Sequence, residues 1–214
     1  MRAVITGANR GIGAGLLAAM TARGDEIIGT SRNPANGLVS CDVTRPDGFG
    51  PLVATLSDRP LDLLVCNAGV YLDRGQRLQD GYRPEDWAAS FAVNVTGVFL
   101  TVQTLLPALR KAGGKIAIIS SMMGSDARAP GGSYIYRASK AAALNLGRNL
   151  AADLRAEGIA VGIYHPGWVR TDMGGSAADI DVETSIRGLV ARFDALDLES
   201  TGRFQNYDGT VLPY

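Results

Sequence analysis

The stretch TGANRGIG, residues 6 to 13, decides how this sequence folds. It follows the short apolar run MRAVI and precedes a longer segment with helical spacing. It contains three glycines, Gly7, Gly11 and Gly13, and glycine allows both a tight turn and a close approach of the backbone to a ligand. Because unpaired N–H groups and the dipole at a helix N-terminus attract anions, the stretch predicts a phosphate site. A tight strand-to-helix turn without a ligand is the alternative.

Short apolar runs rich in β-branched residues recur along the chain. They cover residues 3–6, 26–30, 61–66, 115–120 and 159–164. Segments with helical spacing lie between them, and continuously apolar strands that alternate with helices are typical of a parallel sheet covered on both faces. We therefore predict the α/β class: one doubly wound domain spanning residues 1–214.

The expected helices have recognisable ends. Residues 12–23 have helical spacing and should be capped by Gly24, and residues 138–157 end at Gly158. A third helix should begin at Pro84 and bend or end near Pro107. Residues 177–185 are interpreted as a polar surface stretch.

Composition and charge argue against several classes of function. Lys plus Arg and Asp plus Glu both number 21, so no bulk charge favours nucleic acid or an anionic membrane. We find no run of about 18 apolar residues and no secretory leader pattern, and expect a cytoplasmic protein without a membrane segment. Cys41 and Cys66 lie in or beside apolar runs without metal-binding spacing, which predicts reduced core residues and no metal site.

The glycine spacing G-x-x-x-G-x-G differs from the G-x-G-x-x-G dinucleotide fingerprint, so further motifs must decide. They follow in order: CDVT with Asp42, NAG at 67–69, VNVTG with Asn94, the serines 120 and 121, Tyr136 with Lys140, and HPGWVRT at 165–171. Together they resemble the short-chain dehydrogenase/reductase family over nearly the whole chain. The segments SYIYRASKAAALN and GRFQNYDGTVLPY are most similar to its compact carbonyl-reductase and C-factor-like branch. The resemblance implies a Rossmann-type fold and hydride transfer between a nicotinamide dinucleotide and a small-molecule carbonyl or alcohol.

The spacing of Tyr136 and Lys140 suits acid–base chemistry. They are four residues apart, so a helix that begins at or just before the tyrosine presents both on one face. An adjacent ammonium favours the phenolate, so we expect the pKa of Tyr136 to be lowered from about 10. Such a tyrosine can protonate the alkoxide left by hydride transfer, or accept its proton in the oxidative direction. A pair on the helix surface without function is the alternative, which the surrounding motifs argue against.

The resemblance implies a second role for Lys140 and roles for two more groups, Asn94 and Ser121. Lys140 would also hold the nicotinamide ribose, and Asn94 would hold a water that connects the lysine to solvent. Ser121 would hydrogen-bond the substrate oxygen, with Ser120 and Ser125 as minor candidates. The segment after Ser121 is longer than is common in the family and should bulge outward. As alternatives, Ser121 merely ends a strand and Asn94 caps a kink.

The residues after the second apolar run indicate which dinucleotide binds. An acidic residue there would bind the adenosine ribose of NAD, whereas an arginine can bind the 2′-phosphate of NADP. Ser31 and Arg32 follow the run, and Arg10 could approach the same phosphate from the other side. We therefore predict NADP(H), with NAD as the alternative; solvated loop arginines without a ligand are the other interpretation.

The resemblance also assigns a set of cofactor contacts. They are Gly7, Asn9, Arg10, Gly11, Ile12, Gly13, Ser31, Arg32, Asp42, Val43, Asn67, Ala68, Gly69, Tyr136, Lys140, Pro166, Gly167, Val169 and Thr171. Within this set, the Val169 backbone and the Thr171 hydroxyl would face the nicotinamide carboxamide. The single histidine, His165, is interpreted as a structural turn residue and Tyr134 as a wall of the pocket.

The remaining expectations concern the lid, the assembly and the competing functions. Residues 172–182 would form a short substrate lid over a permissive pocket. The helices over 84–111 and 138–157 resemble the pair that dimerises in the family, which implies a homodimer or homotetramer. One alternative is a signalling or regulatory protein that binds a dinucleotide without turnover. Another is a sugar-nucleotide epimerase or dehydratase, which would need a larger C-terminal domain.

Overall fold

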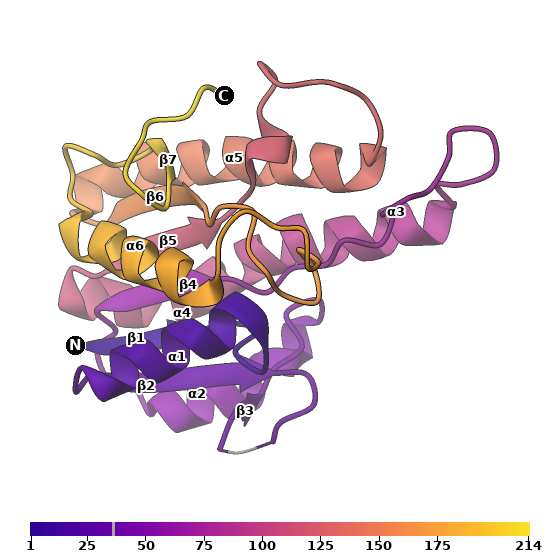
Figure 1. The fold of residues 1–214 in the computed structure, drawn as a ribbon. Helices are drawn as coiled ribbons and strands as arrows, with labels where there is room; N and C mark the ends of the chain where they lie inside the picture. The colour runs from indigo at the N-terminus through magenta and orange to yellow at the C-terminus, as the bar shows by residue number, and fades with distance from the viewer. Residues whose placement is uncertain (36) are drawn as a thin grey trace.

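Seven parallel strands form one sheet within residues 1–35 and 37–214, the part of the chain that this computed structural model describes (Figure 1). They are β1 (Arg2–Ile5), β2 (Glu26–Ser31), β3 (Val39–Ser40), β4 (Leu63–Cys66), β5 (Lys115–Ile119), β6 (Ala160–His165) and β7 (Phe204–Asn206). Their order in the sheet is β3-β2-β1-β4-β5-β6-β7. The order reverses between β1 and β4, and ligands of such sheets bind at the carboxyl ends of the strands beside this point. The predicted doubly wound α/β fold is confirmed.

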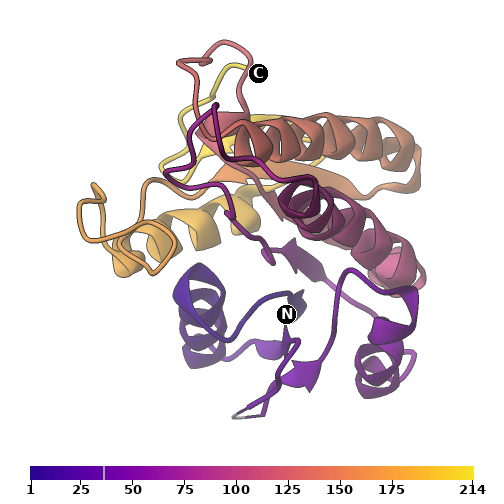
Figure 2. The same cartoon turned by 90° about the vertical axis from the view of Figure 1, so that its right-hand side faces the viewer.

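Helices cover both faces of the sheet (Figure 2). They are α1 (Gly11–Ala22), α2 (Gly50–Leu56), α3 (Pro84–Phe91), α4 (Gly97–Ala112), α5 (Tyr134–Leu154) and α6 (Val182–Ala195). Leu16 of α1 and Phe193 of α6 belong to the apolar core on one face, and Leu105 of α4 and Leu154 of α5 belong to the core on the other. The central strands β4 and β6 are buried along their whole length, which explains why they are continuously apolar in sequence.

The five strands expected from the sequence lie within two residues of their predicted ends. The sequence analysis missed β3 and β7, because strands of two and three residues carry too little periodicity to be recognised. The interpretation of residues 177–185 as a polar surface stretch is wrong for the last four residues of the stretch, which belong to a helix. Helix α6 begins at Val182, and the Asp181 carboxylate caps it by accepting a hydrogen bond from the Thr184 N–H at 2.8 Å. Ser185 of this helix is fully buried.

Of the bend or end expected near Pro107, the end is wrong, because the helical run that begins at Pro84 continues past this residue. Pro107 lies inside α4, which continues to Ala112. The irregularity lies earlier, in a π-helical turn at Ala92–Thr96 that joins α3 to α4. Single π turns interrupt the regular hydrogen-bond ladder and occur often at functional sites. This one carries Asn94.

The run Pro84–Ala112 is long and apolar enough to cross a membrane by length and composition alone. In this structure, Val102, Leu105 and Leu109 of the run are buried in the core beneath the sheet. A core helix of a globular domain meets the same criteria, so the run carries no separate conclusion about a membrane.

Candidate active site

The glycine turn packs tightly against the end of β4. Gly7 has φ +66°, and a Cβ atom at this position would lie 2.9 Å from the Cα of Ala68. A Cβ atom on Gly13 would lie 2.2 Å from the Gly7 carbonyl oxygen. The Asn67 amide donates a hydrogen bond to the same carbonyl oxygen at 3.1 Å. The glycines therefore allow the close packing that brings the N-terminus of α1, with its unpaired N–H groups, to the switch point of the sheet.

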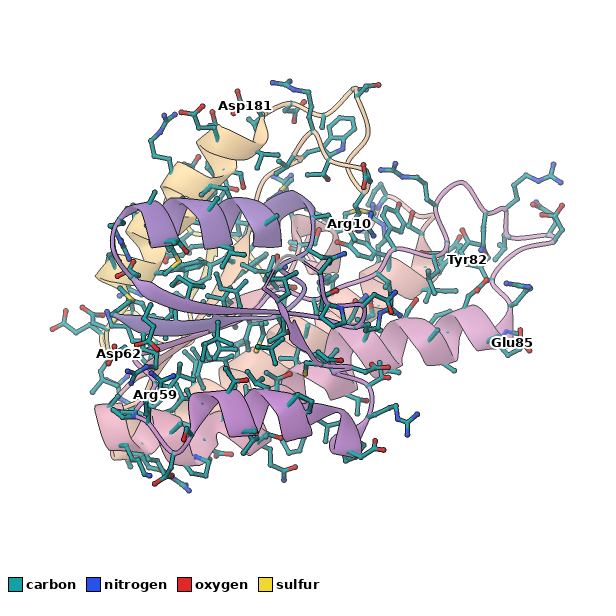
Figure 3. The ribbon with its side chains drawn as sticks, turned by 90° about the horizontal axis from the view of Figure 1, so that it is seen from below. Arg10, Arg59, Asp62, Tyr82, Glu85 and Asp181 are labelled. Carbon is teal, nitrogen blue, oxygen red and sulfur yellow. The ribbon has the colours of Figure 1, made fainter. Side chains whose placement is uncertain are left out.

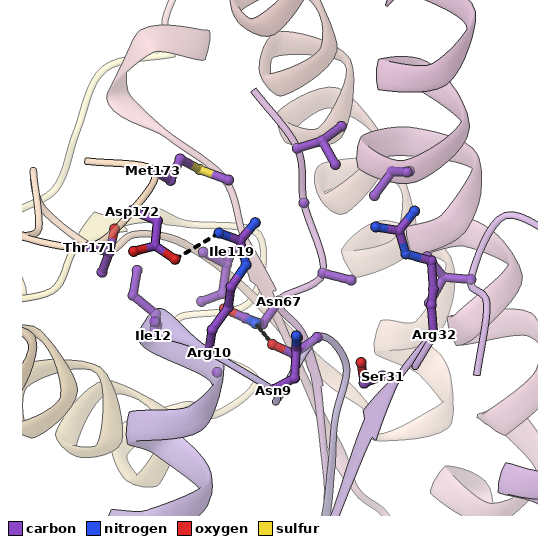
Figure 4. Close-up of a pocket in the computed structure, with 18 of the residues that line it drawn as sticks. Asn9, Arg10, Ile12, Ser31, Arg32, Asn67, Ile119, Thr171, Asp172 and Met173 are labelled. Atoms are coloured by element: carbon purple, nitrogen blue, oxygen red, sulfur yellow. Dashed lines mark hydrogen bonds and ion pairs between the residues drawn. The ribbon is translucent and has the colours of Figure 1, made fainter. Parts of the chain in front are cut away.

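A cleft of ≈ 240 Å³ lies at the carboxyl ends of the strands (Figure 4). Figure 3 shows Arg10 at this end, whereas Arg59 and Asp62, which precede β4, lie at the opposite end of the sheet. The predicted residues that line the cleft are Gly7, Asn9, Arg10, Gly11, Ile12, Gly13, Ser31, Arg32, Asp42, Val43, Asn67, Ala68, Gly69, Tyr136, Lys140, Pro166 and Thr171.

Other lining residues were not predicted as cofactor contacts. They are Asn33, Cys41, Val70, Val93, Ile119, Ser120, Asp172 and Met173. Most of them adjoin a predicted motif in the sequence, so proximity to the motif was the available signal.

Tyr136 and Lys140 lie together at the inner end of the cleft. Helix α5 begins two residues before Tyr136, so the predicted sharing of one helix face is confirmed. Both side chains are buried. The Lys140 ammonium donates a hydrogen bond to the Ile119 carbonyl oxygen at 3.0 Å and lies 5.7 Å from the centroid of the Tyr136 ring.

The pKa of Tyr136 shifts in the direction opposite to the expected one. Burial raises the pKa of Tyr136 to about 12, and the nearby Ser121 hydroxyl opposes this shift. Burial also lowers the pKa of Lys140 to about 8. Because the ammonium is turned toward the carbonyl of Ile119, desolvation of the phenolate outweighs the attraction on which the sequence-based prediction relied.

Of the three candidate serines, Ser121 lies beside the phenol. Its hydroxyl is close enough to lower the pKa of Tyr136 through a hydrogen bond, and it accepts a second one from the Met123 N–H at 3.1 Å. Ser120 is engaged elsewhere, because its hydroxyl donates to the Lys140 carbonyl oxygen at 3.0 Å. Residues 126–132 are exposed in a projecting loop, which confirms the predicted bulge (Figure 1).

Asn94 does not line the cleft. The residue is only 1% exposed. The side-chain oxygen accepts a hydrogen bond from the Val70 N–H at 2.9 Å. The side-chain amide donates hydrogen bonds to the Val70 carbonyl oxygen at 3.0 Å and to the Ser139 hydroxyl at 2.9 Å. Asn94 thus ties the loop after β4 to α5. Its role in holding a water stays a prediction.

Two residues of the loop after β4 contact the first turn of α5 and were missed by the sequence analysis. The Tyr71 ring stacks on that of Tyr136, and its hydroxyl lies 2.5 Å from the Ser133 hydroxyl. The Asp73 carboxylate accepts a hydrogen bond from the Ile135 N–H. Their only signal in the sequence is that they follow the NAG motif closely.

The two arginines of the cleft do not face each other. Arg10 pairs with Asp172 at 3.0 Å between exposed side chains, and Figure 4 shows its guanidinium turned toward this carboxylate. Arg32 lies on the other side of the cleft and has no ion pair within residues 1–35 and 37–214. An exposed pair such as Arg10–Asp172 contributes only about 0–1 kcal/mol, so a bound anion could replace it.

A family model for short chain dehydrogenases matches residues 1–180. The chain belongs to the short-chain dehydrogenase family. It is 40% identical to C-signal from Myxococcus xanthus over 158 residues, which cover 72% of this chain and 93% of the relative. Its fold matches carbonyl reductase Sniffer of D. melanogaster with a TM-score of 0.93, 30% identity, and coverage of 100% and 99% of the two chains.

A second solved structure, the NADPH-bound carbonyl reductase from chicken fatty liver, matches with a TM-score of 0.90 and 29% identity over 100% and 98% of the chains. These matches confirm the Rossmann-type fold and the resemblance to the carbonyl-reductase and C-factor-like branch.

The HPGWVRT motif of this family member contributes only in part to the cleft. Pro166 and Thr171 line it, whereas Gly167 and the buried Val169 lie outside the lining. His165 ends β6, and burial lowers its pKa to about 4, which keeps it neutral and agrees with a structural role.

Two further assignments can be compared with the structure. Tyr134 is exposed, packs edge-to-face on Tyr82 and does not line the cleft, so its interpretation as a pocket wall is not supported. Cys41 and Cys66 are buried and free, as predicted. Among the described residues, no three His, Cys, Asp or Glu side chains gather in a group that could hold a metal ion.

Proposed function

We propose that this protein is an NADP(H)-dependent oxidoreductase that reduces the carbonyl group of an aldehyde or ketone. The observation that carries this proposal is that Tyr136 and Lys140 line one cleft beside the glycine turn, while Ser121 lies beside the Tyr136 phenol. Tyr71 of the loop after β4 stacks on Tyr136, and Pro166 and Thr171 of the segment after β6 line the same cleft, so a small carbonyl compound would enter between these segments.

In the proposed reaction, Ser121 donates a hydrogen bond to the carbonyl oxygen and stabilises its developing negative charge. When bound, the nicotinamide supplies the hydride to the carbonyl carbon. Tyr136 gives its phenolic proton to the oxygen, so that one hydride and one proton convert the carbonyl to an alcohol. With a pKa of about 12 the phenol stays protonated at neutral pH, and this is the form that donates in reduction.

The donor set of the cleft fits a dinucleotide with a 2′-phosphate. The first N–H groups of α1 have no partner inside the helix and suit the pyrophosphate. The residues at the end of β2 that line the cleft are Ser31, Arg32 and Asn33, and none of the three is acidic. The nearby Asp42 carboxylate is engaged by the Thr44 N–H at 3.0 Å and hydroxyl at 2.7 Å. The NADPH bound in the chicken carbonyl reductase supports the same choice.

The test is a turnover screen of the purified protein with NADPH and NADH against aldehydes, ketones and quinones. Turnover is measured as the loss of the absorbance of the reduced nicotinamide. We expect NADPH-dependent reduction of at least one carbonyl class. Tyr136→Phe keeps the ring but removes the proton, so it should abolish nearly all turnover and leave NADPH binding within a few fold. Dinucleotide binding without turnover would instead favour the signalling alternative, which the match to C-signal keeps open.

A further inference from the structure

A carboxylate from a distant loop caps the helix that carries Tyr136. The residue at the N-cap position of α5, Ser133, has φ 47° and makes no side-chain hydrogen bond to the helix. Instead, the Asp73 carboxylate accepts hydrogen bonds from the N–H of Ile135 at 2.8 Å and from the N–H of Tyr136 at 3.2 Å. Asp73 thus replaces the usual local cap from 62 positions away.

The burial of Asp73 makes it an unusual cap. Its exposed fraction is 0%, and it has no ion pair with any cation in residues 1–35 and 37–214. Taking an unpaired carboxylate out of water is costly, and here only N–H groups and the helix dipole offset that cost. A neutral Ser or Thr is sufficient for capping, and Ser133 stands at the right position. Its hydroxyl is instead engaged with Tyr71. Asp73 thus places a carboxylate beneath the Tyr136 backbone although a local residue stands at the cap position.

We propose that Asp73 is a positioning residue for the reaction: it fixes the first turn of α5, and with it the Tyr136 phenol. This inference rests on the proposed function, in which Tyr136 donates the proton. Burial is the main cause of the raised pKa of Tyr136, and the Asp73 charge acts in the same direction. Asp73 is fully buried and does not line the cleft, so it would act through Tyr136.

Two substitutions separate the position from the charge. Asp73→Ala removes both hydrogen bonds, so kcat should fall about tenfold or more while the KM for NADPH changes less than about threefold. Asp73→Asn keeps one acceptor oxygen without the charge, so it should recover most of kcat. In Asp73→Asn, the alkaline limb of the kcat profile for reduction should move to lower pH by about half a unit or more, because removal of a negative charge favours the phenolate.

Amide hydrogen exchange gives a readout that does not depend on activity. The Ile135 and Tyr136 amides should exchange at least about tenfold faster in Asp73→Ala than in the wild type, with α5 beyond its first turn unchanged. Asp80→Asn is the matched control, because Asp80 is an exposed carboxylate of the same loop that pairs with Arg77. It should leave kcat, pH profile and amide exchange as in the wild type.

Wild-type kcat and pH profile in both Asp73 variants would overturn the inference. An Asp73→Asn protein that loses only thermal stability, with an unchanged pH profile of kcat, would also overturn it. If Asp73→Ala does not fold, Asp73→Asn alone is sufficient to test the inference. Tyr136→Phe, measured in parallel, separates the two possible failures. If Tyr136→Phe keeps its turnover, the proposed function fails and this inference with it. If Tyr136→Phe is inactive and the Asp73 variants behave as wild type, this inference alone fails.

Discussion

The ring of Tyr71 lies over that of Tyr136, with centroids 4.3 Å apart and planes inclined by 19°. A stacked ring shields the phenol from water and so contributes to the burial that raises the pKa of Tyr136. The Arg74 guanidinium lies 5.4 Å from the centroid of the Tyr71 ring and donates to the Gly174 carbonyl oxygen at 3.1 Å. This stack links the proposed acid to the segment after β6.

Removal of the Tyr71 ring should change the acidity of Tyr136. In Tyr71→Ala, water reaches the phenol, and we expect the alkaline limb of the kcat profile for reduction to move toward pH 10 and kcat to fall by about tenfold. Tyr71→Phe keeps the stacked ring, so its profile should lie much closer to that of the wild type than the profile of Tyr71→Ala does. The measurement is kcat against pH for both variants. Identical profiles in Tyr71→Ala and wild type would contradict the role of the stack.

The parts of the site that could be predicted are those that depend on contacts close in sequence. The spacing of Tyr136 and Lys140 places them on one helix face wherever the helix lies, and the glycine turn follows directly from a strand-helix junction. By contrast, Asp73 meets a helix 62 positions later, and Arg10 meets Asp172 across 162 positions. No periodicity marks such pairs. The direction of the Tyr136 pKa was also missed, because burial cannot be read from a spacing of four residues.

Substitution of Lys140 should separate function from stability. Lys140→Met removes the ammonium that the family resemblance places at the nicotinamide ribose, so both turnover and NADPH affinity should fall. The same change removes a buried charge whose pKa is lowered to about 8 from an ordinary value of 10.5. The free energy of unfolding at pH 7 should therefore rise, by up to about 3 kcal/mol. Active sites often lower the stability of the folded protein in this way.

The pH dependence of that gain follows from proton binding. Between pH 8 and 10.5 the unfolded wild-type chain binds more protons at Lys140 than the folded one, so wild-type stability from this group rises with pH across that window. The free energy of unfolding of Lys140→Met, measured with urea, should exceed that of the wild type most at or below pH 7. This difference should shrink toward pH 10. Lys111→Met, at an exposed lysine paired with Asp58, is the control and should show no such narrowing. A constant gain at all pH values would show that burial of the charge is not its cause.

The outer faces of α4 and α5 lead to a prediction about assembly. Phe99 of α4 is 42% exposed, and Leu100 and Leu146 are only partly buried. We expect a homodimer or homotetramer that covers this helix pair, as the family resemblance implies. Light scattering should give a mass above that of the monomer, and Phe99→Arg should lower it, because a charge would be desolvated at the interface. A concentration-independent monomer mass for the wild type would exclude this assembly.

Arg32 should determine the preference for NADPH over NADH. It lines the cleft at the end of β2, and a guanidinium can bind a 2′-phosphate with a charge-assisted fork of hydrogen bonds. Arg32→Asp removes this attraction and adds repulsion. The value of kcat/KM with NADPH should therefore fall, by an amount that corresponds to at most about a few kcal/mol of transition-state binding, while kcat/KM with NADH changes little. The measured quantity is the ratio of kcat/KM for the two cofactors.

A nearby arginine provides the control for this experiment. Arg45 pairs with Asp47 on the surface and does not line the cleft, although its charge helps to lower the pKa of Asp42. Because exposed charges are screened over about 10 Å at ordinary ionic strength, Arg45→Asp should change the cofactor ratio far less than Arg32→Asp. Equal effects of the two substitutions would mean that the preference reflects the general charge of this rim and not a contact with Arg32. A wild-type preference for NADH would show that the end of β2 does not select the 2′-phosphate at all.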